Sequence, residues 1–75
     1  MSGRPVKRSL TLRGHRTSVS LEDIFWDAFR EIALRDGQTI NGLAAKIDEE
    51  RGDIGLASAI RVHVFADLKA QIQSA

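Results

Sequence analysis

Cysteine is absent from these 75 residues, and proline and histidine are rare, with one and two copies. Without cysteine the chain can form no disulfide, no cysteine-based metal site and no thiol nucleophile. His15 and His63 are too few and too far apart to predict a zinc site. No apolar run approaches the roughly 18 residues that a membrane span needs, and no signal-peptide core follows the basic start. We therefore expect no metal, no cofactor and no membrane contact, and we place the protein in the cytoplasm.

The charges are unevenly distributed. Residues 1–16 hold five of the eleven basic residues and none of the ten acidic ones, so a basic arm precedes an acidic body. This asymmetry favours a polyanion as partner, contacted by one end of the protein. A solubilising tail is the alternative interpretation. Residues 1–6 are small, polar and interrupted by Pro5, which predicts a flexible basic tail.

The stretch around residues 17–21 alternates polar and apolar side chains, and helical spacing follows it directly. This change of period predicts a short strand that runs into a helix over residues 21–36. One strand cannot satisfy its own backbone hydrogen bonds. A chain of this length also buries only about 60% of its unfolded surface and is marginal alone. A second strand is therefore needed, and association with a second copy is a common source of stability.

A second alternating segment precedes this strand, within the predicted strand region of residues 8–21. Its leucines have even numbers, whereas Val19 and Leu21 have odd ones, so the phase must change between the two segments. A two-residue type II′ turn at Gly14-His15 predicts a hairpin in which the leucines share a face with Val19 and Leu21. A bulge at Gly14 or a loose arm would also explain the change of phase.

Two further helices are predicted after the first, which we expect to be capped by Ser20. The second spans residues 40–51 with Thr39 as its cap and stops at Gly52. The third runs over about residues 54–73, with Asp53 as a candidate cap. Within it, residues 60–65 alternate in a way that would also suit a strand, but the flanking residues favour helix.

Residues 16–50 resemble the ribbon-helix-helix DNA-binding family, the superfamily of the Arc and Met repressors. The resemblance rests on the strand over residues 17–21, the helix that ends before Gly37, and the junction Gly37-Gln38-Thr39-Ile40-Asn41. The stretch over residues 14–22, together with an extra C-terminal helix, resembles a bacterial subgroup of that family. The implied fold is mainly α with a short N-terminal β-ribbon. The chain is expected to consist of the tail, a ribbon-helix-helix core over residues 7–52, and a C-terminal helix over residues 53–75 that packs on the dimer formed by two copies.

The resemblance implies an intertwined homodimer whose antiparallel ribbon enters the major groove of double-stranded DNA. The matching base-contacting positions are Arg16, Ser18 and Ser20. Expected phosphate contacts, some from the basic arm and some at the start of the second helix, are Arg4, Lys7, Arg8, Arg13, Thr39, Ile40 and Asn41. The expected dimer core consists of Val19, Leu21, Phe25, Trp26, Phe29, Ile32, Ile40, Leu43 and Ile47.

Two departures from the family pattern affect the expected specificity. Two of the three ribbon positions are serine, which discriminates between bases poorly, so Arg16 and Arg13 are the expected readers. If the hairpin forms, a dimer would have four strands, whereas a groove admits two. The outer strands would then contact phosphates or lie back from the groove.

These observations favour a small repressor-like transcriptional regulator. An alternative is a protein-interaction adaptor or antitoxin-like protein whose C-terminal helix binds a partner. A helix-turn-helix centred on Gly37 is a third interpretation, although the second helix is poor in base-reading side chains. We expect no enzymatic activity and no catalytic residues, because Glu49 and Glu50 are adjacent and cannot share a helix face, and no serine sits in a nucleophile elbow.

Overall fold

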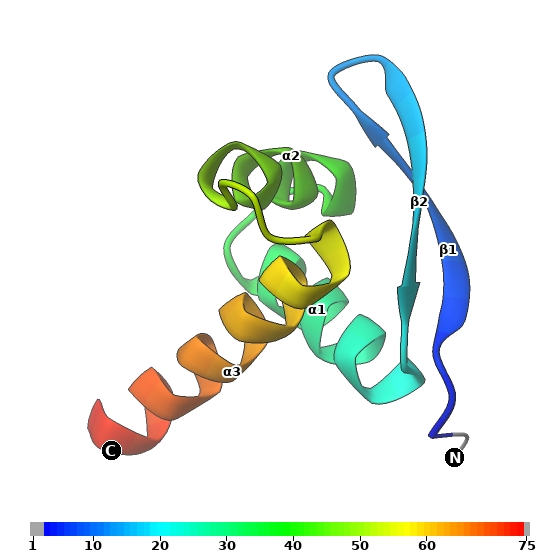
Figure 1. The fold of residues 1–75 in the computed structure, drawn as a ribbon. Coiled ribbons are helices and arrows are strands. Elements are labelled where there is room, and N and C mark those ends of the chain that lie inside the picture. The colour runs from blue at the N-terminus through cyan, green and yellow to red at the C-terminus, as the bar shows by residue number, and fades with distance from the viewer. Residues whose placement is uncertain (1–2, 75) are drawn as a thin grey trace.

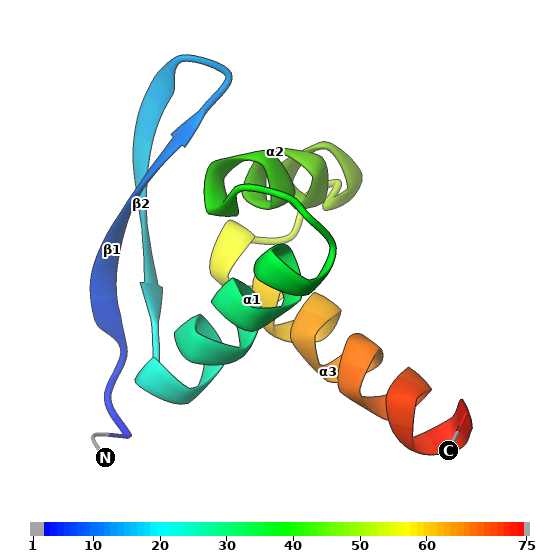
Figure 2. The ribbon, with the colours of Figure 1, turned by 180° about the vertical axis from the view of Figure 1, so that it is seen from behind.

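The computed structural model describes residues 3–74, which form a β-hairpin followed by three helices. The strands β1 (Val6–Leu12) and β2 (His15–Leu21) pair antiparallel. The helices are α1 (Asp23–Arg35), α2 (Ile40–Glu50) and α3 (Leu56–Ser74). The hairpin lies along one side of the helices, and the C-terminal part of α3 extends away from the body (Figures 1 and 2).

The predicted hairpin forms, but its predicted turn is wrong. Leu12 pairs with His15, so the turn residues are Arg13 and Gly14 rather than Gly14 and His15. Both have positive φ, +52° and +83°, as a type I′ turn requires. The true register differs from the predicted one by two residues, with Leu10 opposite Thr17. A shift of two leaves every side chain on its predicted face, so the alternation could not distinguish the two registers.

Arg13 tests this turn because a positive φ costs an ordinary side chain about 1–2 kcal/mol. Asparagine tolerates this conformation, and Asn-Gly is a preferred type I′ pair. We expect Arg13→Asn to raise the free energy of unfolding, measured by urea denaturation, by about 1 kcal/mol. His15→Asn is the control and should not stabilise the protein. If only His15→Asn raised the free energy of unfolding, the result would support a turn at Gly14-His15 instead.

The core lies between the inner face of the hairpin and the three helices. Each element contributes a few fully apolar side chains, so no element buries its apolar face alone. The largest side chains excluded from solvent are Leu21, Phe29 and Ile60. The buried set is Leu10, Val19, Leu21, Phe29, Ile32, Ala33, Leu43, Ala44, Ile47, Ala59, Ile60 and Val64.

The ends of the elements differ from several predictions. β1 already begins at Val6, so the predicted tail is shorter, and its first two residues lie outside the described range. Ser20 is not the cap of α1, because pairing of Leu21 with Val6 extends β2 and leaves Glu22 at the N-cap. The third helix begins at Leu56, so Asp53 lies three residues before it and not at the position of the cap. Residues 60–65 are helical, and the alternative strand does not form there.

Arg35 joins the end of α1 to the middle of α3. Its guanidinium donates to both carboxylate oxygens of Asp67, at 2.9 and 3.0 Å, and to those of the neighbouring Asp36. These hydrogen bonds hold the pKa of both carboxyls below their ordinary value of 3.8. A lowered carboxyl pKa adds stability above the ordinary value, and this contribution is lost as the pH falls through the lowered value.

Arg35→Ala should therefore weaken the acid sensitivity of folding. With the guanidinium absent, Asp36 and Asp67 titrate closer to their unfolded values, so the variant should lose less unfolding free energy between pH 6 and pH 3 than the wild type. Urea denaturation at both pH values measures this difference. Equal losses for the two proteins would show that these pairs do not contribute to the pH dependence.

Candidate nucleic-acid interface

The outer face of the hairpin carries the polar side chains of both strands. Three cross-strand pairs occupy this face: Lys7 with Ser20, Ser9 with Ser18, and Thr11 with Arg16. All six residues are exposed. Each predicted base-contacting residue of β2 therefore has a β1 residue directly opposite it. The structure brings Arg16, Ser18 and Ser20 together on one surface, as the sequence predicted from alternation.

The charge of this face is entirely positive. Neither β1 nor β2 contains an acidic residue. Lys7 and Arg16 stand near opposite ends of the face, and neither forms an ion pair within residues 3–74. Arg13, in the turn, pairs with Glu49 of α2, which leaves it 63% exposed but partly neutralised. Arg4 is exposed and precedes β1.

The backbone groups of the hairpin show which edges are available. The N–H of Thr11 points away from β2 and donates to Oδ1 of Asn41 in α2, at 3.0 Å. Backbone groups alternate in direction along an antiparallel strand, and Thr11 lies opposite Arg16. In β2, the backbone N–H and C=O groups of Arg16, Ser18 and Ser20 therefore point away from β1. The carbonyl of Ser20 faces Arg61 of α3, with an N···O distance of 3.4 Å. The outer edge of β2 is therefore open at Arg16 and Ser18.

The start of α2 lies beside the hairpin, as Figure 1 shows. Thr39 is the N-cap, as predicted, and its hydroxyl accepts a hydrogen bond from the N–H of Gly42 at 2.9 Å. The N–H groups of Ile40 and Asn41 belong to the first turn, which has no intrahelical acceptors for them. Such a helix start favours an anion such as phosphate.

Asn41 has a second role that the sequence did not reveal. Its side-chain oxygen is engaged by Thr11, so it fixes the start of α2 to the edge of β1. Only its backbone N–H and its amide NH₂ remain for the phosphate contact expected at this position.

Arg8 does not lie on the polar face, contrary to its expected phosphate contact. It pairs with Asp23, and its guanidinium lies 5.2 Å from the centre of the Trp26 ring. Alternation places residue 8 on the inner face opposite Val19, so the long side chain covers the edge of the core. In this position Arg8 stabilises the join between β1 and α1 and contributes little to an outward charge.

The other expected core residues separate into two groups. Six of the nine residues expected at the dimer core are buried within the single chain, namely Val19, Leu21, Phe29, Ile32, Leu43 and Ile47. Phe25, Trp26 and Ile40 are partly buried against them. The chain therefore fills most of this core without a second copy.

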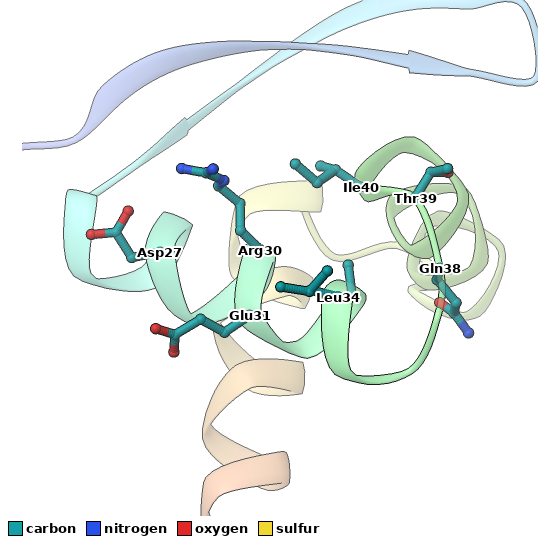
Figure 3. Close-up of a pocket in the computed structure, with 8 residues that line it drawn as sticks. Asp27, Arg30, Glu31, Leu34, Gln38, Thr39 and Ile40 are labelled. Atoms are coloured by element: carbon teal, nitrogen blue, oxygen red, sulfur yellow. The ribbon is translucent and has the colours of Figure 1, made fainter.

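Sequence reasoning missed three residues near this surface. Ser9 and Thr11 lie on the polar face opposite Ser18 and Arg16, and no contact was predicted for either. Arg30 was not singled out at all. It extends from α1 toward the hairpin, beside Ile40, in a hollow that Asp27 and Glu31 also line (Figure 3). The mixed charges of this hollow do not make a phosphate site, and no motif in the sequence marks it.

Asn41→Ala tests the attachment of α2 to the hairpin. The variant leaves the Thr11 N–H without its acceptor, and a typical hydrogen bond contributes about 0.5–1.5 kcal/mol to stability. We expect a loss within that range and faster hydrogen exchange at the Thr11 amide. Thr11→Ala retains the backbone donor and is the control. Unchanged exchange at residue 11 in Asn41→Ala would show that the bond does not hold the hairpin.

Comparison with known families matches residues 5–68 to a family model described as a ribbon-helix-helix domain. The match covers the hairpin, α1, α2 and most of α3, so the chain belongs to the ribbon-helix-helix family. Comparisons with curated proteins and with solved structures gave no significant match. The helix-turn-helix interpretation is therefore set aside.

Membership places the protein in a family of DNA-binding regulators whose fold is typically non-enzymatic. Among the described residues, no helix has the length and apolar character to cross a membrane. Within the same residues no group of acidic, histidine or cysteine side chains could hold a metal ion.

Proposed function

We propose that the protein is a sequence-preferring DNA-binding homodimer that acts as a small transcriptional regulator. The observation that carries this proposal is the acid-free outer face of the hairpin. Lys7 and Arg16 lie near its two ends, and neither forms an ion pair with any residue that the structure describes. A surface of this charge attracts phosphates, and short hydroxyl side chains between the two cations allow close approach to base edges.

The proposed docking places β2 at the centre of the interface. Arg16 and Ser18 reach base edges, and Ser20 lies further along the same strand. The major groove admits two strands, so two copies of β2 fill it, and the β1 strands lie toward its walls. Lys7 of β1 is then positioned for phosphate rather than base contact. The first turn of α2, held beside β1 by Asn41, supplies backbone N–H groups to the same phosphate chain.

The open edge of β2 supports the homodimer. Arg16 and Ser18 direct backbone groups outward, and a strand edge of this kind pairs with another strand when one is present. An antiparallel pair in which Arg16 meets Ser18 of a second copy satisfies these groups in both chains. The family to which the chain belongs supports the same arrangement.

Arg16→Ala tests the base contact. A duplex enriched from a randomised pool serves as the probe, and fluorescence anisotropy measures its affinity against a scrambled duplex. A bidentate base contact is worth about 1–3 kcal/mol, so affinity for the enriched duplex should fall about 5–150-fold while affinity for the scrambled duplex changes less. Lys7→Ala should weaken both duplexes and reduce the salt slope by about one.

Arg35→Ala is the matched control, because it removes an arginine that is bound to Asp67 and lies outside the hairpin. It should leave both affinities unchanged. Equal affinity of the wild type and Arg16→Ala for the enriched duplex would remove Arg16 from base recognition. Failure of the pool to enrich any duplex would contradict the proposed function itself.

A further inference from the structure

An apolar patch lies on the helices next to the open edge of β2. It consists of Phe25 at the start of α1 and Val62, Phe65 and Ala66 on α3, and we call it the α3 patch. Val62 and Phe65 are 63% and 61% exposed. These four residues line a shallow hollow with Arg61 and Lys69. Large apolar side chains grouped in this way mark an interaction surface.

Helix α3 is apolar on more than its buried side. Ala59, Ile60 and Val64 pack into the core, whereas Val62, Phe65, Leu68 and Ile72 face solvent. A surface helix normally has one apolar stripe, and a helix that is apolar all round is normally covered on both sides. The single chain covers only one side of α3.

Arg61 connects the α3 patch to the edge of β2. It lines the hollow, donates to both carboxylate oxygens of Glu22 at 2.9 and 3.2 Å, and reaches the carbonyl of Ser20. Its guanidinium also lies 5.8 Å from the centre of the Phe25 ring. The patch and the open backbone groups of β2 are therefore parts of one continuous surface.

From this continuity we infer that the α3 patch binds a second copy of this chain and forms the apolar half of the interface whose polar half is the edge of β2. This inference rests on the homodimer of the proposed function. An antiparallel strand edge matches its own copy under two-fold symmetry, so a second copy that pairs there is brought beside the α3 patch. Among residues 3–74, no comparable feature favours a different binding partner at the α3 patch.

The charges around the α3 patch are compatible with self-association. The charge of Arg61 is balanced by Glu22. Of the cations that line the hollow, this leaves only Lys69 without an ion pair among residues 3–74. Two copies therefore meet without a large like-charge repulsion.

The opposite side of the molecule is less suited to a second copy. There Leu34 is 82% exposed, but the hollow that it lines is also lined by the charged residues Asp27, Arg30 and Glu31 (Figure 3). The strand edge nearest that side belongs to β1, whose Thr11 N–H is already held by Asn41. A desolvated interface on that side would bury charged groups at a cost.

Phe65→Glu and Leu34→Glu form a matched pair that tests this inference. Both residues are largely exposed in the single chain, so neither change empties the core. Multi-angle light scattering over a dilution series measures the dimer dissociation constant of each variant, and circular dichroism checks its helix content. We expect the wild type and Leu34→Glu to be dimers. Phe65→Glu should raise the dimer dissociation constant at least about 30-fold, as loss of an interface hot spot does.

The possible outcomes separate this inference from the homodimer itself. A monomeric wild type would contradict both. A Phe65→Glu protein with the dimer dissociation constant of the wild type would overturn the role of the α3 patch and leave the homodimer standing, whatever the result for Leu34→Glu. Val62→Lys provides a second test if Phe65→Glu fails to fold, and an unchanged dissociation constant for Val62→Lys would overturn the role of the α3 patch in the same way.

Discussion

The pairing of β2 with β1 is the interaction on which the rest of the structure depends. It gives β2 a partner inside the chain and directs Arg16 and Ser18 outward on the remaining edge. It also separates the two faces of the hairpin, so that polar side chains collect on one face and Leu10, Val19 and Leu21 close the core on the other. The pairing of β1 with β2 thus determines which side chains form the charged face, which ones close the core, and which edge of β2 stays open.

This arrangement links stability to recognition. The hairpin is held at one edge by Asn41 of α2 and at the other by Arg61 of α3, so the helices fix the orientation of the polar face. Rigid support of this kind places Lys7, Arg16 and the start of α2 at constant spacing, which phosphate contacts require. The serines between the cations limit base discrimination, so electrostatic attraction should dominate affinity and make it strongly dependent on salt.

The capping preference of threonine predicted the cap at Thr39, and hydrophobic periodicity predicted the order of the elements and the two faces of the hairpin. It could not locate the turn, because two registers that differ by two residues give the same faces. The charge of the basic arm led to the prediction that Arg8 contacts phosphate, since charge alone does not reveal that the side chain pairs with Asp23 and lies over Trp26. The bond between Asn41 and Thr11 joins residues thirty positions apart, and no local pattern encodes it. The position of the exposed apolar side chains of α3 beside β2 also required the structure.

Amide hydrogen exchange, followed residue by residue by NMR at a concentration where the protein associates, tests the central claim most directly. The account predicts slow exchange at Arg16 and Ser18, whose N–H groups meet a second copy of β2. It predicts fast exchange at Lys7 and Ser9, whose N–H groups point outward from β1 toward solvent. Exchange at Arg16 and Ser18 as fast as at Lys7 and Ser9 would show that the edge of β2 stays open. The paired ribbon, and the mode of DNA binding built on it, would then be contradicted.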